Sequence, residues 1–179
     1  MNAIKERIYS DSSYSIDAVN LDLGEGIHCK FPLMHHPGGV VILAVNDKNQ
    51  VALVKQNRFA IEEETLELPA GKLDKSATET PLEGAQRELR EEVGCLAKEW
   101  TFLGYVYPSP GILDEKLWLY FAKEIIPSQQ DLDFDEILTA EWIDLETFHS
   151  FISAGSIHDA KTLCAYLIAK EKGLLVLTN

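Results

Sequence analysis

The chain has 179 residues, 46% of them hydrophobic, which suits one globular core with a small appendage. Sixteen basic residues against twenty-nine acidic ones give a formal net charge of −13, a surface that repels nucleic acid, anionic membranes and, unless metal ions reverse the local charge, phosphorylated ligands. Three scattered cysteines without C-x-x-C spacing predict neither a zinc site nor a disulfide framework. Because the chain shows neither a signal peptide nor a membrane span, we expect a cytoplasmic location.

Residues 1–38 predict a small antiparallel β unit. The alternating stretches YSIDAVNLDL and GIHCKFP are typical of strands, and Pro37-Gly38-Gly39 marks the boundary with the main domain, residues 39–179. Two or three short strands bury little apolar surface by themselves and need a further surface to cover one face. We therefore expect a homodimer in which this unit packs against the partner subunit.

The segment after the β unit leads into the core. His35 and His36 are adjacent, so their side chains diverge on a strand, and no acidic residue is spaced to join them. We interpret the pair as a polar linker and not as metal ligands. The apolar runs VVILAV and QVALVKQ follow, separated by residues 46–49, and predict a hairpin of two strands bound for the core.

A helix rich in carboxylates follows a Pro-Ala-Gly turn. Thr80 as N-cap, Pro81 at the first helical position and Glu83 at N3 are typical of a helix start with a capping box. Gly94 is a natural end for the helix. Apolar residues recur at helical spacing and predict one buried stripe, made of Leu82, Ala85, Leu89 and Val93.

Three glutamates lie beside that stripe. Glu88 is three and four positions from Glu91 and Glu92, and each like-charge contact costs about 0.2–0.5 kcal/mol unless a cation relieves it. Arg87 can pair with Glu91 from one turn away. Glu88 and Glu92 then follow one edge of the buried stripe, which suits hard oxygen ligands of a divalent cation. A solvated helix face is the alternative interpretation of these carboxylates.

The rest of the chain predicts three strands and two helices. The strands are WTFLGYVYPSP, KLWLYFAKEI and EILTAEWIDL. Asp144 can cap a short helix that ends near Gly155. The final helix, which ends by Gly173, places one apolar stripe of Ala160, Leu163, Cys164, Leu167 and Ile168 toward the core. This order of strands and helices predicts a layered α/β fold.

A wider pattern resembles the Nudix box and comprises Gly71, Glu79, Arg87-Glu88-Leu89, Glu91-Glu92 and Gly94. The second half matches fully, with Cys95 in a place that is normally aliphatic. Seven residues, not five, separate Gly71 from Glu79, and we interpret the two extra residues as a longer loop before an intact helix. The flanking runs LVKQNRFAIEEETLELPAGKLD, SPGILDEKLWLYFA and IHDAKTLCAYLIA are similar to the ADP-ribose pyrophosphatase branch of this family. The resemblance implies a Nudix α/β/α sandwich with a mixed sheet after the N-terminal β unit.

The resemblance also implies a site for Mg²⁺, with Mn²⁺ as an alternative. Its ligands would be the carboxylates of Glu88, Glu92 and Glu136 and the backbone carbonyl of Ala70, with Asp135 as the alternative to Glu136. Metal ions would neutralise the charge of a diphosphate, and a carboxylate would deprotonate the attacking water.

Further site residues follow from the same resemblance. Glu115 would be the base, carried on a mobile loop, with Asp114 or Glu91 as alternatives, while Glu91 and Arg87 complete the catalytic helix. Arg58 and Glu67 would bind the substrate, and a surface ion pair of Arg58 with one of Glu62 to Glu64 is the other interpretation.

The implied reaction is hydrolysis of the diphosphate bond of ADP-ribose or a similar nucleoside diphosphate sugar, which gives a nucleoside monophosphate and a sugar phosphate. GDP-mannose, dinucleoside polyphosphates and a non-catalytic nucleotide-sensing module are the alternatives. Members of this branch are commonly dimers that exchange the N-terminal β segment, so an aromatic residue there, Tyr9, Tyr14 or Phe31, is a candidate to reach the nucleotide base.

Overall fold

The computed structural model describes residues 2–76, 78–132 and 137–177. Its elements in chain order are β1 Asn2–Ser10, β2 Ser15–Gly24, β3 Ile27–His35, β4 Gly39–Ala44, β5 Gln50–Arg58, β6 Glu63–Glu67, β7 Ala70–Lys72, α1 Pro81–Val93, β8 Cys95–Val106, β9 Leu117–Pro127, β10 Leu138–Asp144, α2 Leu145–Ser153 and α3 Ala160–Glu171. No helix in these residues is long and apolar enough to cross a membrane.

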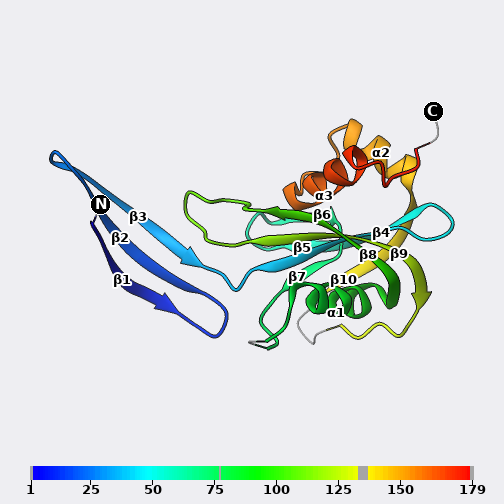
Figure 1. Cartoon of the computed structure of the whole chain (residues 1–179), viewed down its shortest axis with the longest axis horizontal. Helices are drawn as coiled ribbons and strands as arrows, with labels where there is room; N and C mark the ends of the chain where they lie inside the picture. The colour runs from blue at the N-terminus through cyan, green and yellow to red at the C-terminus, as the bar shows by residue number, and fades with distance from the viewer. Residues whose placement is uncertain (1, 77, 133–136, 178–179) are drawn as a thin grey trace.

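The first three strands form an antiparallel sheet of their own, in the order β1-β2-β3. Figure 1 shows this sheet standing away from the main body of the molecule. The predicted N-terminal β unit is confirmed, although the sequence patterns did not single out β1 as a strand. Several apolar side chains of the sheet are exposed, among them Ile4, Ile8 and Ile27.

The main body is a sandwich of sheets between helices. Two sheets, with strand orders β10-β5-β6 and β7-β4-β9-β8, combine one parallel pair, β4 with β9, with antiparallel neighbours. Helix α1 lies below the sheets in Figure 1, and α2 and α3 lie above them. The predicted α/β/α sandwich with a mixed sheet is therefore confirmed.

Strand β4 is buried on both faces because helices cover both sides of the sheets. Val40, Ile42 and Ala44 pack in a cluster with the α1 residues Ala85 and Leu89. The alternate residues, Val41 and Leu43, pack in a second cluster with α2 and α3. This central strand therefore ties the two helical layers together.

The predicted hairpin of β4 with β5 is wrong. In the described part of the chain the two strands meet through a single bridge, Val45–Val51, and then diverge into different sheets. The backbone of β4 pairs instead with β7 and β9, which come later in the chain. Both strands nevertheless enter the core as expected.

The predicted apolar stripe of α3 is confirmed in part: Leu163, Cys164 and Ile168 are partly buried against the core, but the most buried face of the helix lies beside them. The buried residues of this helix are Thr162, Ala165, Tyr166 and Ala169, whereas Leu167 is 56% exposed. The Leu68 N–H donates a hydrogen bond to Thr162 Oγ1 at 2.8 Å, and the Tyr166 ring packs edge-on against Phe148. A buried backbone amide needs a hydrogen-bond partner, so the helix turns Thr162 toward Leu68. Hydrophobic periodicity cannot predict a buried threonine.

Candidate active site

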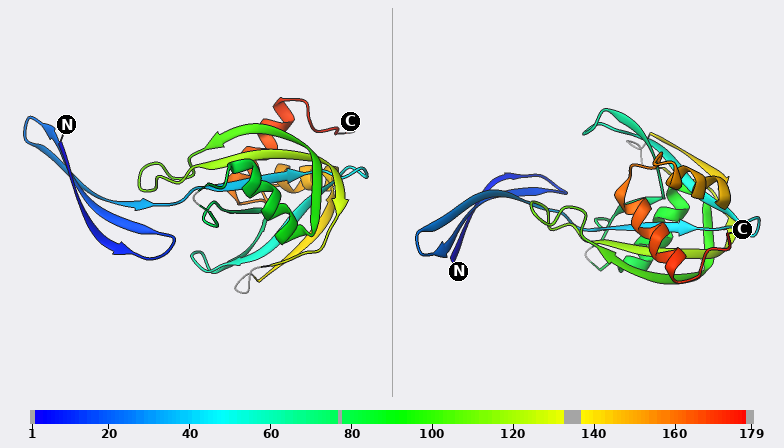
Figure 2. Two further views of the ribbon diagram at one scale, coloured as in Figure 1. Left: turned by 60° about the horizontal axis from the view of Figure 1, so that its bottom comes forward. Right: turned by 90° about the horizontal axis from the view of Figure 1, so that it is seen from above.

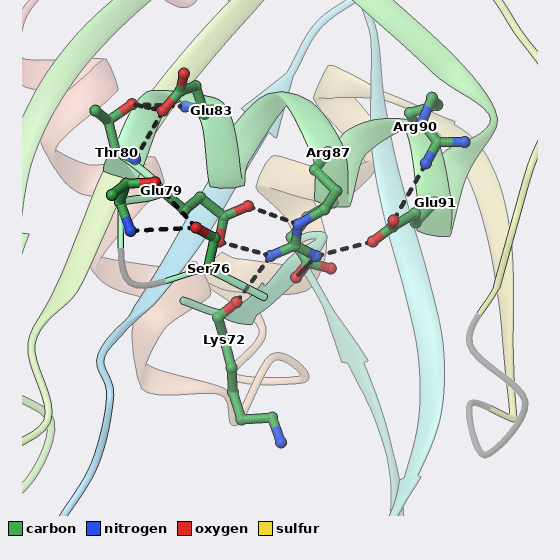
Figure 3. A network of polar contacts seen from close by, with 10 residues as sticks. Lys72, Ser76, Glu79, Thr80, Glu83, Arg87, Arg90 and Glu91 are labelled. Atoms are coloured by element: carbon green, nitrogen blue, oxygen red, sulfur yellow. Dashed lines mark hydrogen bonds and ion pairs between the residues drawn. The ribbon is translucent and has the colours of Figure 1, made fainter. Parts of the chain in front are cut away.

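Helix α1 begins as its capping residues predict. The Thr80 hydroxyl accepts a hydrogen bond from the Glu83 N–H, and the Glu83 carboxylate accepts one from the Thr80 N–H at 2.8 Å (Figure 3). Gly94 closes the helix in the left-handed conformation at φ 68°, which costs glycine little. The carboxylates of this helix are thus held on a rigid element with well-defined ends.

The first glycine of the box lets this helix approach the sheet closely. A Cβ added to Gly71 would collide with the carboxylate of Glu88, so any other residue there would displace that carboxylate. On the face of the helix that packs against the sheet, Ala85 and Leu89 are fully buried. The glycine therefore places the Glu88 carboxylate directly over the backbone of β7.

Arg87 organises the polar face of the helix. Its guanidinium donates to Glu88 Oε1 at 2.6 Å, to Glu91 Oε2 at 2.8 Å and to the Lys72 carbonyl at 2.9 Å. A further bond joins Arg87 Nε to Glu79 Oε1 at 2.8 Å, so the two extra loop residues leave this glutamate in use (Figure 3). Burial opposes the charge, yet these carboxylates raise the pKa of Arg87 above its ordinary value.

Glu88 and Glu92 are buried glutamates, with 4% and 3% of their surface exposed. The alternative of a solvated helix face is therefore wrong for these two residues. The Ala70 N–H donates to Glu92 Oε2 at 2.9 Å, which brings this carboxylate against the strand that carries the expected carbonyl ligand. Glutamates are almost never this buried without a cationic or hydrogen-bonding partner, and here Arg87 and the Ala70 N–H are such partners.

The donor set suits a hard divalent cation, since it consists of carboxylate and carbonyl oxygens. Within the described residues, no group of three or more His, Cys, Asp or Glu side chains already converges on a metal position. Arg87 bonds Glu88 Oε1 at 2.6 Å and so orients this carboxylate on the helix. The remaining expected ligand, Glu136, and its alternative Asp135 lie outside the described residues.

A second polar cluster surrounds Glu67 at the end of β6. Arg58 Nε donates to Glu67 Oε1 at 2.7 Å, and a second Arg58 nitrogen and Lys161 Nζ both bind the other carboxylate oxygen. Arg58 thus pairs with Glu67 and not with Glu62 to Glu64. Lys161 comes from α3, 94 residues away in sequence, and no local motif in the sequence singled it out. Lys161 also bonds Asp159 Oδ1 at 2.8 Å, so the cluster pairs two cations with two carboxylates. The forked donors of Arg58 and the ammonium of Lys161 are groups that can bind a phosphate.

Burial alone would raise the pKa of the Glu67 carboxyl, but the hydrogen bond from Arg58 and the charge of Lys161 hold it at about 2, below its ordinary 4.5. Because the folded-state pKa is lowered, the stabilisation is complete above pH 4.5 and is lost as the pH falls through about 2. We expect Glu67 to contribute about 3 kcal/mol to the free energy of unfolding at neutral pH.

Urea unfolding at pH 7 and pH 3 would measure this contribution. Glu67→Gln should lower stability at pH 7 and flatten the loss of stability between the two pH values. Glu64→Gln, an exposed residue of the same strand, is the matched control. Equal stability of wild type and Glu67→Gln at pH 7 would contradict the assignment.

The loop between β8 and β9 carries Glu115 beside His36. The Glu115 carboxylate lies 3.3 Å from His36 Nδ1, and both side chains are largely shielded from solvent. Asp114 uses both oxygens: one accepts from the His36 N–H at 2.9 Å, and the other lies 2.6 Å from His35 Nδ1. The expectation that no acidic residue joins the histidines is therefore wrong, because folding brings Asp114 and Glu115 from almost eighty positions away. Their place between β3 and β4 agrees with the predicted linker.

Comparison with known proteins agrees with this geometry. The family model of the NUDIX domain matches residues 34–166. The chain is 36% identical over 171 residues to the ADP-ribose pyrophosphatase of Bacillus subtilis (strain 168), which covers 93% of this chain and 91% of that protein. It is 33% identical over 170 residues to the methanol dehydrogenase activator of Bacillus methanolicus, with the same two coverages. A crystal structure of an ADP compounds hydrolase matches the fold with a TM-score of 0.81 at 23% identity, covering 97% of this chain and 94% of that one.

A mixed-sheet sandwich that supports a capped helix of buried glutamates defines a class of metal-dependent hydrolases. The family match and the identity over nearly the whole chain show that the protein belongs to the Nudix family. It is an enzyme of the Nudix pyrophosphatase type, which hydrolyses phosphoric anhydrides. The resemblance inferred from the box residues is thereby confirmed.

Proposed function

We propose that the protein hydrolyses the diphosphate bond of ADP-ribose, or of a similar nucleoside diphosphate sugar, to a nucleoside monophosphate and a sugar phosphate. The observation that carries this proposal is the buried pair Glu88 and Glu92, organised by Arg87 on a helix with the complete second half of the box. The ADP-ribose pyrophosphatase that matches the chain at 36% identity supports the same substrate class.

The metal in this proposal is Mg²⁺, with Mn²⁺ as the alternative. Glu88, Glu92 and the carbonyl of Ala70 would hold it, together with Glu136 or Asp135. When bound, it would neutralise the diphosphate and polarise its phosphorus–oxygen bonds. Arg87 orients Glu88 and Glu91 in advance, since one guanidinium bonds both carboxylates.

Glu115 is the proposed base, because it lies on a surface loop and both carboxylate oxygens of its neighbour Asp114 already contact histidines. Both oxygens of Asp114 accept or face hydrogen-bond donors, which makes it an anchor of the loop. His36 Nδ1 accepts a hydrogen bond from the Gly38 N–H at 3.0 Å, and burial lowers the His36 pKa, so this ring is neutral and does not cancel the charge of Glu115. Closure of the loop would bring Glu115 to the water and exclude bulk solvent.

Arg58 and Lys161 are the proposed contacts to the phosphate groups, with Glu67 holding both in place. The negative charge of Glu92 helps to raise the pKa of Arg58, so the cluster and the carboxylates of α1 influence each other electrostatically. A phosphate that enters would take over donors that now point at Glu67.

A panel of nucleoside diphosphate derivatives assayed with magnesium, scored by kcat/KM, tests the proposed function. ADP-ribose should lead the panel, ahead of GDP-mannose and dinucleoside polyphosphates. Product analysis should find AMP and ribose phosphate in equal amounts. Tight binding of a nucleotide without turnover would identify a sensing module instead.

We further propose that residues 1–38 are a dimerisation unit that completes the site of residues 39–179 in the partner subunit. The exposed apolar residues support this, since Ile4 is 71% and Ile8 is 59% exposed on a sheet with little core of its own.

Light scattering should find a dimer for the full chain and a monomer for a chain that begins at Gly38. Replacing both exposed isoleucines, Ile4→Asp with Ile8→Asp, should weaken the full-length dimer in the same way. The shortened chain should also show a raised KM if the unit reaches the substrate of its partner. A monomeric full chain, or a shortened dimer with unchanged KM, would refute the proposal.

A further inference from the structure

The N-terminal sheet meets the β8–β9 loop along a short backbone seam. The Met34 N–H donates to the Ile112 carbonyl at 2.8 Å, and the Asp114 N–H donates to the Met34 carbonyl at 3.1 Å. Met34 and Leu113 pair as a parallel bridge. Both views in Figure 2 show the loop reaching toward the end of β3. The loop that carries Glu115 is therefore bonded to the end of β3 through the backbone of Met34.

His35 adds a charged link across this seam. Its Nδ1 lies 2.6 Å from Asp114 in the loop, and its Nε2 lies 2.9 Å from Asp17 in β2. Asp17 is buried in turn against Arg7 of β1. The hydrogen bonds to Asp17 and Asp114 raise the pKa of His35, which favours the ring that donates from both nitrogens. His35 thus joins β3 and β2 to the loop, and Asp17 extends the link to Arg7 of β1.

The next two loop residues lie against the linker that follows β3 and against β8. Glu115 faces His36 at 3.3 Å, and the ammonium of Lys116 lies 3.8 Å from the centre of the Tyr105 ring of β8. Glu115 therefore lies between two anchored neighbours, Asp114 and Lys116. The Asp114 anchor is the one that belongs to the N-terminal sheet.

We propose that His35 is a positioning residue: by bridging Asp17 and Asp114, it ties the N-terminal sheet to the loop and sets the rest position of Glu115. The inference rests on the proposed function in one respect, the role of Glu115 as base. The contact itself makes no use of substrate or metal. Any movement of the N-terminal sheet, including its packing against a partner subunit, is transmitted to the catalytic loop through this bridge.

Full-length His35→Ala tests the bridge, with hydrogen exchange and steady-state kinetics as readouts. Exchange in residues 109–116 should increase, while exchange in α1 and β9 stays as in wild type. kcat should fall about tenfold with KM within about twofold, because a displaced base affects the chemical step more than binding. The matched control is His28→Ala, on the same strand with its side chain 71% exposed, which should change neither readout.

A double-mutant cycle separates the bridge from a general loss of structure. Asp114→Ala also loses the bond from the His36 N–H, so it should lower kcat at least as much as His35→Ala, and the double variant should be no worse than Asp114→Ala alone. Asp17→Asn, close to the wild type in size, should also loosen residues 109–116. Additive losses in the cycle, or unchanged exchange of the loop in His35→Ala, would overturn the inference.

The two readouts also separate this inference from the proposed function. A wild type that hydrolyses no nucleoside diphosphate would refute the function, whereas loop exchange would still decide the bridge. An active wild type whose loop exchange and kcat are insensitive to His35 would refute the bridge alone.

Discussion

Glu92→Gln should lower turnover by about a hundred- to a thousandfold at saturating magnesium, and Glu88→Gln should do the same. Each change keeps the size of the side chain and removes one of the two buried carboxylates that would hold the metal. The glutamine oxygen can still accept the Ala70 N–H, so the fold should persist. Without metal, Glu92→Gln should be as stable as wild type or more stable by about 0.2–0.5 kcal/mol, because one of the like charges on the helix is removed. Glu88→Gln also loses the charge that pairs with Arg87, so it should be the less stable of the two variants.

Magnesium titration by calorimetry, run beside the kinetic assay, would check the cause. Affinity for the ion should fall with turnover in both variants. Glu99→Gln, an exposed glutamate of β8, removes the same charge from the surface and should leave both quantities unchanged. Near wild-type turnover in either Glu88→Gln or Glu92→Gln would show that the metal ligands lie elsewhere.

Glu115→Gln should lower kcat by about a hundredfold or more with little change in the affinity for magnesium or in KM. A general base acts mainly in the transition state and typically contributes a factor of about 10²–10⁴. The amide cannot take a proton from water, yet it can occupy the same place beside His36. Single-turnover kinetics would show whether the chemical step is the one that slows.

Asp114→Asn is the informative comparison for that variant. If Asp114 is an anchor, its loss should cost no more than about tenfold in kcat, well short of the loss for Glu115→Gln. A larger loss at Asp114 would reverse the assignment of the base. A large rise in the dissociation constant for magnesium in Glu115→Gln would instead identify Glu115 as a metal ligand.

Local sequence determined the catalytic helix almost completely. Thr80, Pro81, Glu83 and Gly94 set its ends through bonds that reach no further than one turn, so pattern and structure agree there. The pairs Arg87 with Glu91 and Glu88 with Glu92 likewise follow from helical periodicity, which places residues four positions apart on one face. The same short-range logic predicted the strands that enter the core.

Only the tertiary structure decided which elements meet. The partners of β4 are chosen by sheet topology, and its own sequence favours a hairpin with β5 equally well. The rotation of α3 depends on the Leu68 amide that Thr162 satisfies. The contacts of Glu67 with Lys161 and of His35 with Asp114 join residues 94 and 79 positions apart. A charge pattern shows that such residues need partners, but the partner is set by the path of the chain between them, which is a property of the whole packed core.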